Sequence, residues 1–138
     1  MGVIPWSPLA GGWLSGKYRR GAELPSGGRA ARIPQRYDPS IPENQRKLDA
    51  AERLAQLAEE AGLTLIELAI AFVLRHPAVT APIIGPRTME QLESQLPALD
   101  VSLDDELLDR IDEIVPPGTN LNPADAGWTP PSLRRSAG

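Results

Sequence analysis

The run from residue 82 to residue 91, Pro-Ile-Ile-Gly-Pro-Arg-Thr-Met-Glu-Gln, constrains the fold of this chain more than any other segment. It predicts an apolar strand from Val79 to Ile84 that passes through Gly85 directly into a helix start. A short apolar run between turn residues is typical of a parallel strand that is covered on both faces. Thr88 and Gln91 have the spacing of a capping box, which fixes where the helix begins.

The same segment predicts a phosphate pocket. Gly85 lets the backbone approach a ligand closely, and the first N–H groups of a helix point outward with partial positive charge. Arg87 adds a planar guanidinium that binds two phosphate oxygens at once. The alternative is a surface arginine that neutralises Glu90, because strand–glycine–helix turns are common and most bind nothing.

The rest of the chain predicts helices and one further strand. A strand-like Val3-Ile4 pair opens the chain, and a loop with three glycines follows it. Apolar residues at three- and four-residue spacing predict helices over the ranges 43–61, 65–76, 89–96 and 103–115, with Thr64 and Glu67 as a second capping box and Ser102 as the last cap. The range 65–76 is apolar nearly all round, which predicts burial on several sides. Residues 19–42 lack periodicity and predict a lid or mobile loop.

The predicted elements follow the order of a βαβα unit: strand, loop, helix, helix, strand, helix, helix. This order places the chain in the α/β class. Two strands alone do not make an independent parallel sheet with both faces and both edges covered.

Composition limits the function. The 138 residues are 41% apolar, which suits a globular protein, and the net charge of −4 argues against a general nucleic-acid binder. There is no cysteine and one histidine, which argues against thiol chemistry and a metal site. No stretch approaches the roughly 20 apolar residues of a membrane helix, and no leader pattern is present, so we expect a cytoplasmic protein. The excess of arginine over lysine hints at a GC-rich bacterial genome.

Two segments carry a resemblance to a known family. Residues 6–18 (Trp-Ser-Pro-Leu-Ala-Gly-Gly-Trp-Leu-Ser-Gly-Lys-Tyr) and 83–95 (Ile-Ile-Gly-Pro-Arg-Thr-Met-Glu-Gln-Leu-Glu-Ser-Gln) resemble the aldo-keto reductase family, in its loop after barrel strand seven and its strand eight with the following helix. The resemblance implies the C-terminal part of a TIM (β/α)8 barrel: strands seven and eight with their helices, plus a C-terminal helix and tail. The chain then divides into a strand and cofactor loop (1–18), a long loop (19–42), helices (43–76), a strand and phosphate-binding helix (79–96), a C-terminal helix (103–115) and a tail (116–138).

The resemblance also implies an NADP(H) site. Trp6 corresponds to the residue against the nicotinamide ring, and Arg87 to the residue that binds the 2′-phosphate, which favours NADPH over NADH. Trp6 as a packing residue of the barrel rim and Lys17 as an ordinary loop lysine are the alternatives. The other implied cofactor residues are Ser7, Pro8, Leu9 and Gly11 near the pyrophosphate, Lys17 near the phosphates, and Gly85, Gln91, Ser94 and Gln95 around the 2′-phosphate and adenine. Ser94 and Gln95 depart from the family's usual glutamate and asparagine.

No catalytic residue is assigned. The family's Asp, Tyr, Lys and His tetrad lies in the first half of its sequence, and nothing here matches it. His76, before Pro77, is interpreted as a residue at a helix C-terminus, favoured there by the helix dipole. Tyr18 and Tyr37 are loop tyrosines without a placed Lys–Asp pair.

The leading hypothesis is the C-terminal portion of an NADPH-dependent aldo-keto reductase, a family that reduces aldehydes and ketones to alcohols. We expect the chain alone to be inactive in that reaction. One alternative is a non-enzymatic nucleotide-binding or assembly module, whose sheet edges are covered by an N-terminal half or by a second copy. Another is an inactive truncated product, favoured by Met1 standing immediately before a strand.

Overall fold

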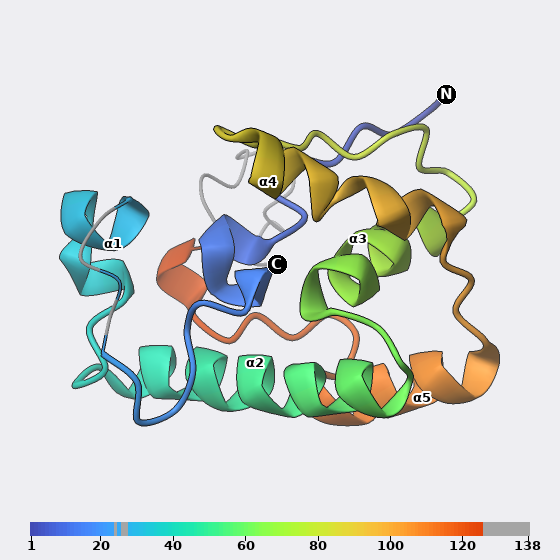
Figure 1. The fold of residues 1–138 in the computed structure, drawn as a ribbon. Coiled ribbons are helices and arrows are strands. Elements are labelled where there is room, and N and C mark those ends of the chain that lie inside the picture. Colours follow the sequence, from blue (N-terminus) through green and yellow to red (C-terminus); the bar gives the residue numbers. More distant parts are fainter. Residues whose placement is uncertain (24, 26–27, 126–138) are drawn as a thin grey trace, which may run out of the picture.

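A computed structural model describes residues 1–23, 25 and 28–125 of the chain. Helices dominate it (Figure 1). The α-helices of this part are α1 (Arg29–Arg32), α2 (Pro42–Glu60), α3 (Leu65–Arg75), α4 (Met89–Glu93) and α5 (Asp105–Ile114). The 3-10 helices are η1 (Ala10–Ser15), η2 (Pro34–Arg36), η3 (Leu96–Asp100) and η4 (Pro123–Asp125). None of these helices is long and apolar enough to span a membrane.

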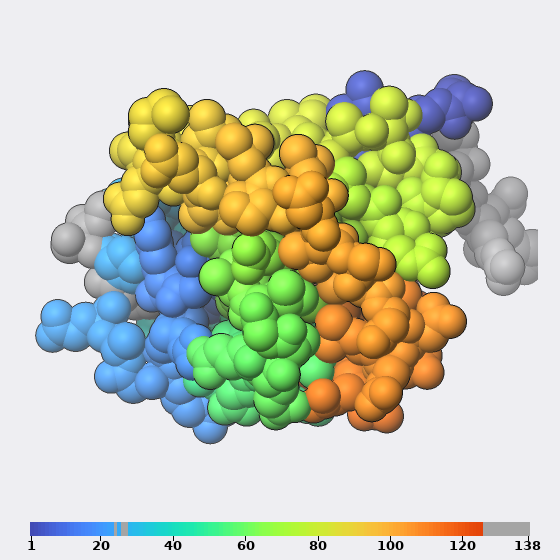
Figure 2. Space-filling view, turned by 45° about the vertical axis from the view of Figure 1, so that its right-hand side comes forward, coloured from blue at the N-terminus to red at the C-terminus, as the bar shows by residue number. Residues whose placement is uncertain are grey.

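The main core lies where α2, α3 and α5 meet. Its buried members come from all three helices and from the segment before α5: Leu57, Ala58, Leu68, Ala71, Leu103 and Ile111. Together with the partly buried Leu54, Leu107, Leu108 and Ile114 that pack against them, these residues recur at three- and four-residue spacing, so the predicted amphipathic pattern explains this packing. η3 packs on α3, and Figure 2 shows α4 and η3 (yellow to orange) lying over the green surface of α3.

Local capping sets the start of α3. The Thr64 side chain accepts a hydrogen bond from the Glu67 amide, and the Glu67 carboxylate accepts one from the Thr64 amide at 2.7 Å. This confirms the predicted capping box. His76 is the C-cap of α3, as predicted, and its Nδ1 accepts a hydrogen bond from the Ala78 amide at 3.1 Å. The predicted burial of α3 holds in part: Leu65, Leu68, Ala69, Ile70 and Ala71 are buried, whereas Phe72 is 44% exposed.

Two helix predictions are wrong in extent. The helix expected over 89–96 ends at Glu93, and the chain continues as η3 after a short break. The helix expected from Leu103 begins at Asp105, and its cap is Asp104, whose Oδ1 accepts from the Leu107 amide at 2.8 Å. Ser102 lies two residues before this cap and is therefore not the N-cap residue of α5.

The predicted strands are present only as isolated parallel bridges, Val3 with Val79 and Trp6 with Ile83. The parallel pairing is therefore confirmed, whereas no continuous strand forms in the described residues. The burial expected for the 79–84 strand is also wrong at Ile83, which is 54% exposed. A parallel pair gains its stability from neighbouring strands and from helices on both faces, and the described residues provide neither cover here.

The segment predicted as a structureless loop, 19–42, contains α1 and η2. It folds back on the first loop of the chain and forms a second core with Trp13, Tyr18, Ala30 and Tyr37, against which Leu48 packs. The prediction missed this because the segment's order comes from aromatic packing between distant positions rather than from helical periodicity. The tail prediction beyond residue 125 lies outside the described residues.

Candidate functional site

The first part of the site is the loop that runs from Trp6 into η1. Its backbone takes left-handed dihedral angles at Gly11 (φ 71°) and Gly12 (φ 109°), which glycine adopts without a steric penalty. Ser7 (φ 61°) and Ala10 (φ 49°) also have positive φ, and these residues carry a Cβ atom that disfavours this region. Strained residues of this kind cluster at ligand-binding loops and persist only where the surroundings hold them.

An aromatic stack of Trp13, Tyr18 and Tyr37 supports this loop. The Trp13 and Tyr37 rings lie 5.3 Å apart between centroids, and the Tyr18 and Tyr37 rings 5.1 Å apart, both pairs within 19° of parallel. The Tyr37 hydroxyl donates a hydrogen bond of 2.7 Å to the Gly11 carbonyl. The stack therefore ties the loop to the turn that precedes α2.

The two stacked tyrosines are not primed for proton transfer at neutral pH. Burial raises the pKa of Tyr37 above its ordinary value, although Arg29 and Arg36 oppose the rise. Burial also raises the pKa of Tyr18, with a further contribution from Tyr37. General acid–base catalysis by a tyrosine is instead helped by a pKa that is lowered toward the working pH.

The second part of the site is the loop around Arg87. The Thr88 hydroxyl accepts from the Gln91 amide at 3.3 Å, which confirms Thr88 as the cap of α4. The Gln91 side chain does not complete the predicted capping box, since its Oε1 accepts from the Arg87 amide at 2.8 Å. The Gln91 side chain thus satisfies the amide of the residue before the N-cap instead of the amide of the N-cap itself, and it fixes the backbone of Arg87.

The segment that begins at Gly28 connects the two parts, although it contains none of the predicted site residues. A Cβ atom built on Gly28 stands 3.7 Å from Nη2 of Arg87, and one built on Gly11 stands 3.6 Å from Nη1 of Arg29. The α1 segment thus lies close to both predicted phosphate-binding loops. Its arginines stand in a stretch without periodicity, so no sequence pattern singled them out.

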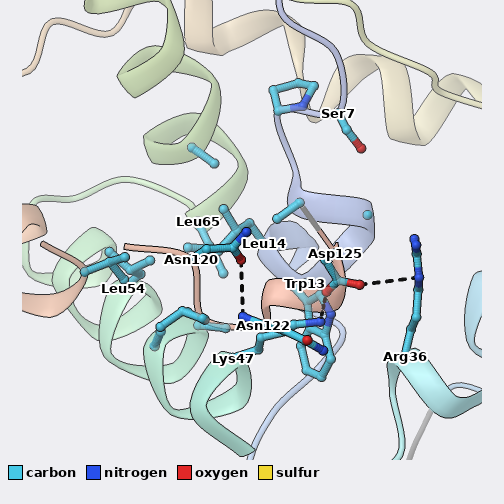
Figure 3. A pocket seen from close by; sticks show the side chains of 18 of the residues that line it. Ser7, Trp13, Leu14, Arg36, Lys47, Leu54, Leu65, Asn120, Asn122 and Asp125 are labelled. Carbon is cyan, nitrogen blue, oxygen red and sulfur yellow. Dashed lines mark hydrogen bonds and ion pairs between the residues drawn. The ribbon is translucent and has the colours of Figure 1, made fainter. Parts of the chain in front are cut away.

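A cavity of about 640 Å³ adjoins the first loop. Trp6, Ser7, Pro8 and Gly11 line one end of it, whereas α2, α3 and α5 supply apolar side chains elsewhere. Among the residues that the structure describes, four cationic side chains line the cavity against one carboxylate: Arg29, Arg32, Arg36 and Lys47 against Asp125. Figure 3 shows Asp125 between Lys47 and Arg36. The charge balance of this wall favours an anionic ligand group.

The remaining predicted residues are dispersed. Leu9 lies in the first loop, where its carbonyl accepts from the Gly12 amide at 2.8 Å, and Lys17 lines a separate cavity of about 370 Å³. Gly85 and Arg87 are exposed, Gln91 is half-buried, and the half-buried Ser94 donates its hydroxyl to the Gln91 carbonyl at 2.8 Å. Gln95 is only 7% exposed, so its side chain has less access to a ligand than Arg87.

The sequence profile of the Aldo/keto reductase family matches residues 1–116, which is most of the chain. The chain belongs to the aldo/keto reductase family. It is 39% identical to "Uncharacterized oxidoreductase YrpG" of Bacillus subtilis over 93% of this chain and 36% of the relative. It is 34% identical to "Putative voltage-gated potassium channel subunit beta" of Schizosaccharomyces pombe, over 83% of this chain and 34% of the relative.

Its fold matches a glycerol dehydrogenase from Gluconobacter oxydans with a TM-score of 0.67 and 25% identity, over 94% of this chain and 38% of that one. The chain thus spans little more than a third of the length of these relatives. The family implies a (β/α)8 barrel, and the match covers part of such a barrel. This agrees with the expected α/β fold class, although the described residues hold isolated bridges in place of the two expected strands.

Proposed function

We propose that this chain forms the phosphate-binding side of an NADPH site in an aldo-keto reductase. The observation that carries the proposal is the cationic cavity wall beside the glycine loop, where Arg29 stands next to Gly11. Backbone amides of a glycine loop and adjacent guanidinium groups are the donors that a pyrophosphate needs.

The Arg87 loop supplies the second anion-binding position. Arg87 is exposed, its backbone is fixed by Gln91, and its side chain lies near Gly28. A guanidinium in this position binds the 2′-phosphate of NADPH in a bidentate manner, and NADH lacks that group. Arg87 is therefore the residue that discriminates between the two cofactors.

Trp6 completes the cofactor side of the site. Its side chain is 78% exposed at the end of the cavity, so its ring offers a face for stacking against nicotinamide. When bound, the dinucleotide supplies the hydride donor for carbonyl reduction. The residues of this chain bind and orient it, and none of them is assigned to proton transfer, so we expect no aldehyde reduction by the purified chain.

Fluorescence titration of the purified chain with NADPH and with NADH tests this proposal. We expect saturable quenching by NADPH, and a roughly 10-fold or larger increase in its Kd in Arg87→Ala, since a hydrogen-bonded charge contributes about 1.5–3 kcal/mol. Arg46→Ala, which removes an exposed arginine from α2, is the matched control and leaves the Kd unchanged. Absence of quenching by both nucleotides, or equal weakening of both in Arg87→Ala, contradicts the proposal.

A second function, assembly with another polypeptide, is favoured by the exposed N-terminal bridge pair. Val3, Ile4 and Ile83 are 45%, 59% and 54% exposed, which is unusual for apolar residues beside paired backbone. Further parallel strands from a second copy would cover them. Sedimentation velocity tests this, since self-association should weaken in Ile83→Lys, and a wild-type chain that remains monomeric at high concentration argues against self-association.

A further inference from the structure

We propose that Tyr37 is a positioning residue for the loop from Trp6 to Ser15, and that Asn44 holds Tyr37 in place. The effect of Tyr37 on nucleotide affinity rests on the proposed function above. Its effect on the loop itself does not depend on that function.

The loop needs an external support. Ser7 and Ala10 both have positive φ, and a residue with a Cβ atom loses roughly 1–2 kcal/mol in this region. The backbone hydrogen bonds inside the loop are short-range turns, such as Ala10 N–H to the Ser7 carbonyl at 2.9 Å. Such turns do not by themselves select one strained conformation over a relaxed one.

Tyr37 provides that support from 26 residues further along the chain. Its hydroxyl donates to the Gly11 carbonyl at 2.7 Å, within the part of the loop that faces the cavity. The residue is 4% exposed, and its ring packs against both Trp13 and Tyr18, which also contact each other at 4.9 Å between ring centroids. The ring therefore has little freedom to turn its hydroxyl away, which makes this hydrogen bond a fixed constraint on Gly11.

Asn44 fixes the backbone on both sides of Tyr37. It lies in the first turn of α2 and is 1% exposed. Its side-chain amide donates to the Gln35 carbonyl at 2.9 Å and to the Asp38 carbonyl at 3.0 Å. Because these carbonyls flank Tyr37 in sequence, one buried side chain couples the start of α2 to the tyrosine and, through it, to Gly11.

This coupling leads to two expected effects of Tyr37→Phe. The variant keeps the stacked ring and removes only the hydroxyl. The loop amides of Ala10, Gly12 and Leu14, which donate to Ser7 and Leu9, should exchange their hydrogens faster. The Kd for NADPH should rise by roughly 3- to 10-fold, because binding then has to order a looser loop.

Hydrogen exchange by NMR on the full 138-residue chain tests the inference, with Tyr18→Phe as the matched control in the same stack. We expect exchange to rise at the three loop amides in Tyr37→Phe, to stay unchanged in the middle of α2, and to stay unchanged throughout in Tyr18→Phe. Asn44→Ala should reproduce the faster loop exchange. If Asn44→Ala does not fold, Tyr37→Phe decides the role of the tyrosine.

The outcomes separate this inference from the proposed function. Unchanged exchange at the loop amides in Tyr37→Phe overturns it, even where the wild-type chain binds NADPH. A uniform rise in exchange across α2 and the loop also overturns it, since this indicates general destabilisation. Faster loop exchange in a chain that binds no nucleotide supports the positioning role and contradicts only the proposed function.

Discussion

The Lys47 amine and the Asp125 carboxylate form an ion pair that joins α2 to a segment 78 residues further along the chain. The Lys47 side chain is 10% exposed and that of Asp125 27%. Figure 3 shows this pair at the wall of the cavity, with Arg36 on the other side of the carboxylate at 3.4 Å. The ion pair therefore keeps the segment after α5 against the rest of the site.

Replacing Lys47 by methionine tests the contribution of this pair. The variant keeps the aliphatic stem but leaves Asp125 with Arg36 alone, so we expect the free energy of unfolding to fall by about 1–3 kcal/mol. Arg20→Met is the control, because the Arg20–Asp49 pair is exposed at 66% and 47% and should contribute less than about 1 kcal/mol. Urea unfolding measures both; equal losses would show that burial does not distinguish the pairs.

The cap of α3 gives a second prediction. Thr64→Ala removes the hydroxyl that accepts from the Glu67 amide, so stability should fall by about 1 kcal/mol. Thr64→Ser retains an oxygen at the same position and should stay within about 0.5 kcal/mol of wild type. The urea midpoints of the three proteins check this, and an equal loss in the serine variant would show that the methyl group rather than the cap matters.

Two glycines of the site should respond differently to alanine. Gly12 has φ 109°, so Gly12→Ala should cost at least about 1 kcal/mol of stability, although its Cβ would meet only ordinary contact with Tyr18. Gly85 has no positive φ and nothing within 4 Å of a built Cβ, so Gly85→Ala should leave stability nearly unchanged. If Gly85→Ala lowers the affinity for NADPH but leaves stability intact, the ligand lies close to the backbone at residue 85.

Features set by neighbouring residues were predictable from the sequence. The capping box at Thr64 and the amphipathic stripe of α2 depend on residues three or four positions apart, and the structure has both as expected. The strands at Val3 and Val79 were predicted at greater length than they have. Strand pairing depends on partners elsewhere in space, so an apolar run does not reveal whether its faces are covered.

The same distinction applies to the site. The glycine loop and the Arg87 turn carry local signatures, and these signatures are what predicts them as binding loops. Arg29 and Tyr37 act through contacts with Gly11, which is distant in sequence, and they stand in a segment without periodicity. Residues that support a loop from such a distance have no sequence pattern of their own, which is why the sequence placed them in a structureless segment.

Alkaline pH should weaken the second core through its tyrosines. Burial raises the pKa of Tyr37 and of Tyr18 in the folded chain above the ordinary value of 10.0. The unfolded chain therefore loses these protons first, so the stabilisation is complete below about pH 10 and is lost as pH rises through the folded-state pKa values. Urea unfolding between pH 8 and pH 11 should show this decline, and it should be smaller in Tyr37→Phe, which has one fewer buried phenol. An identical decline in the variant would show that other groups, such as lysines, account for it.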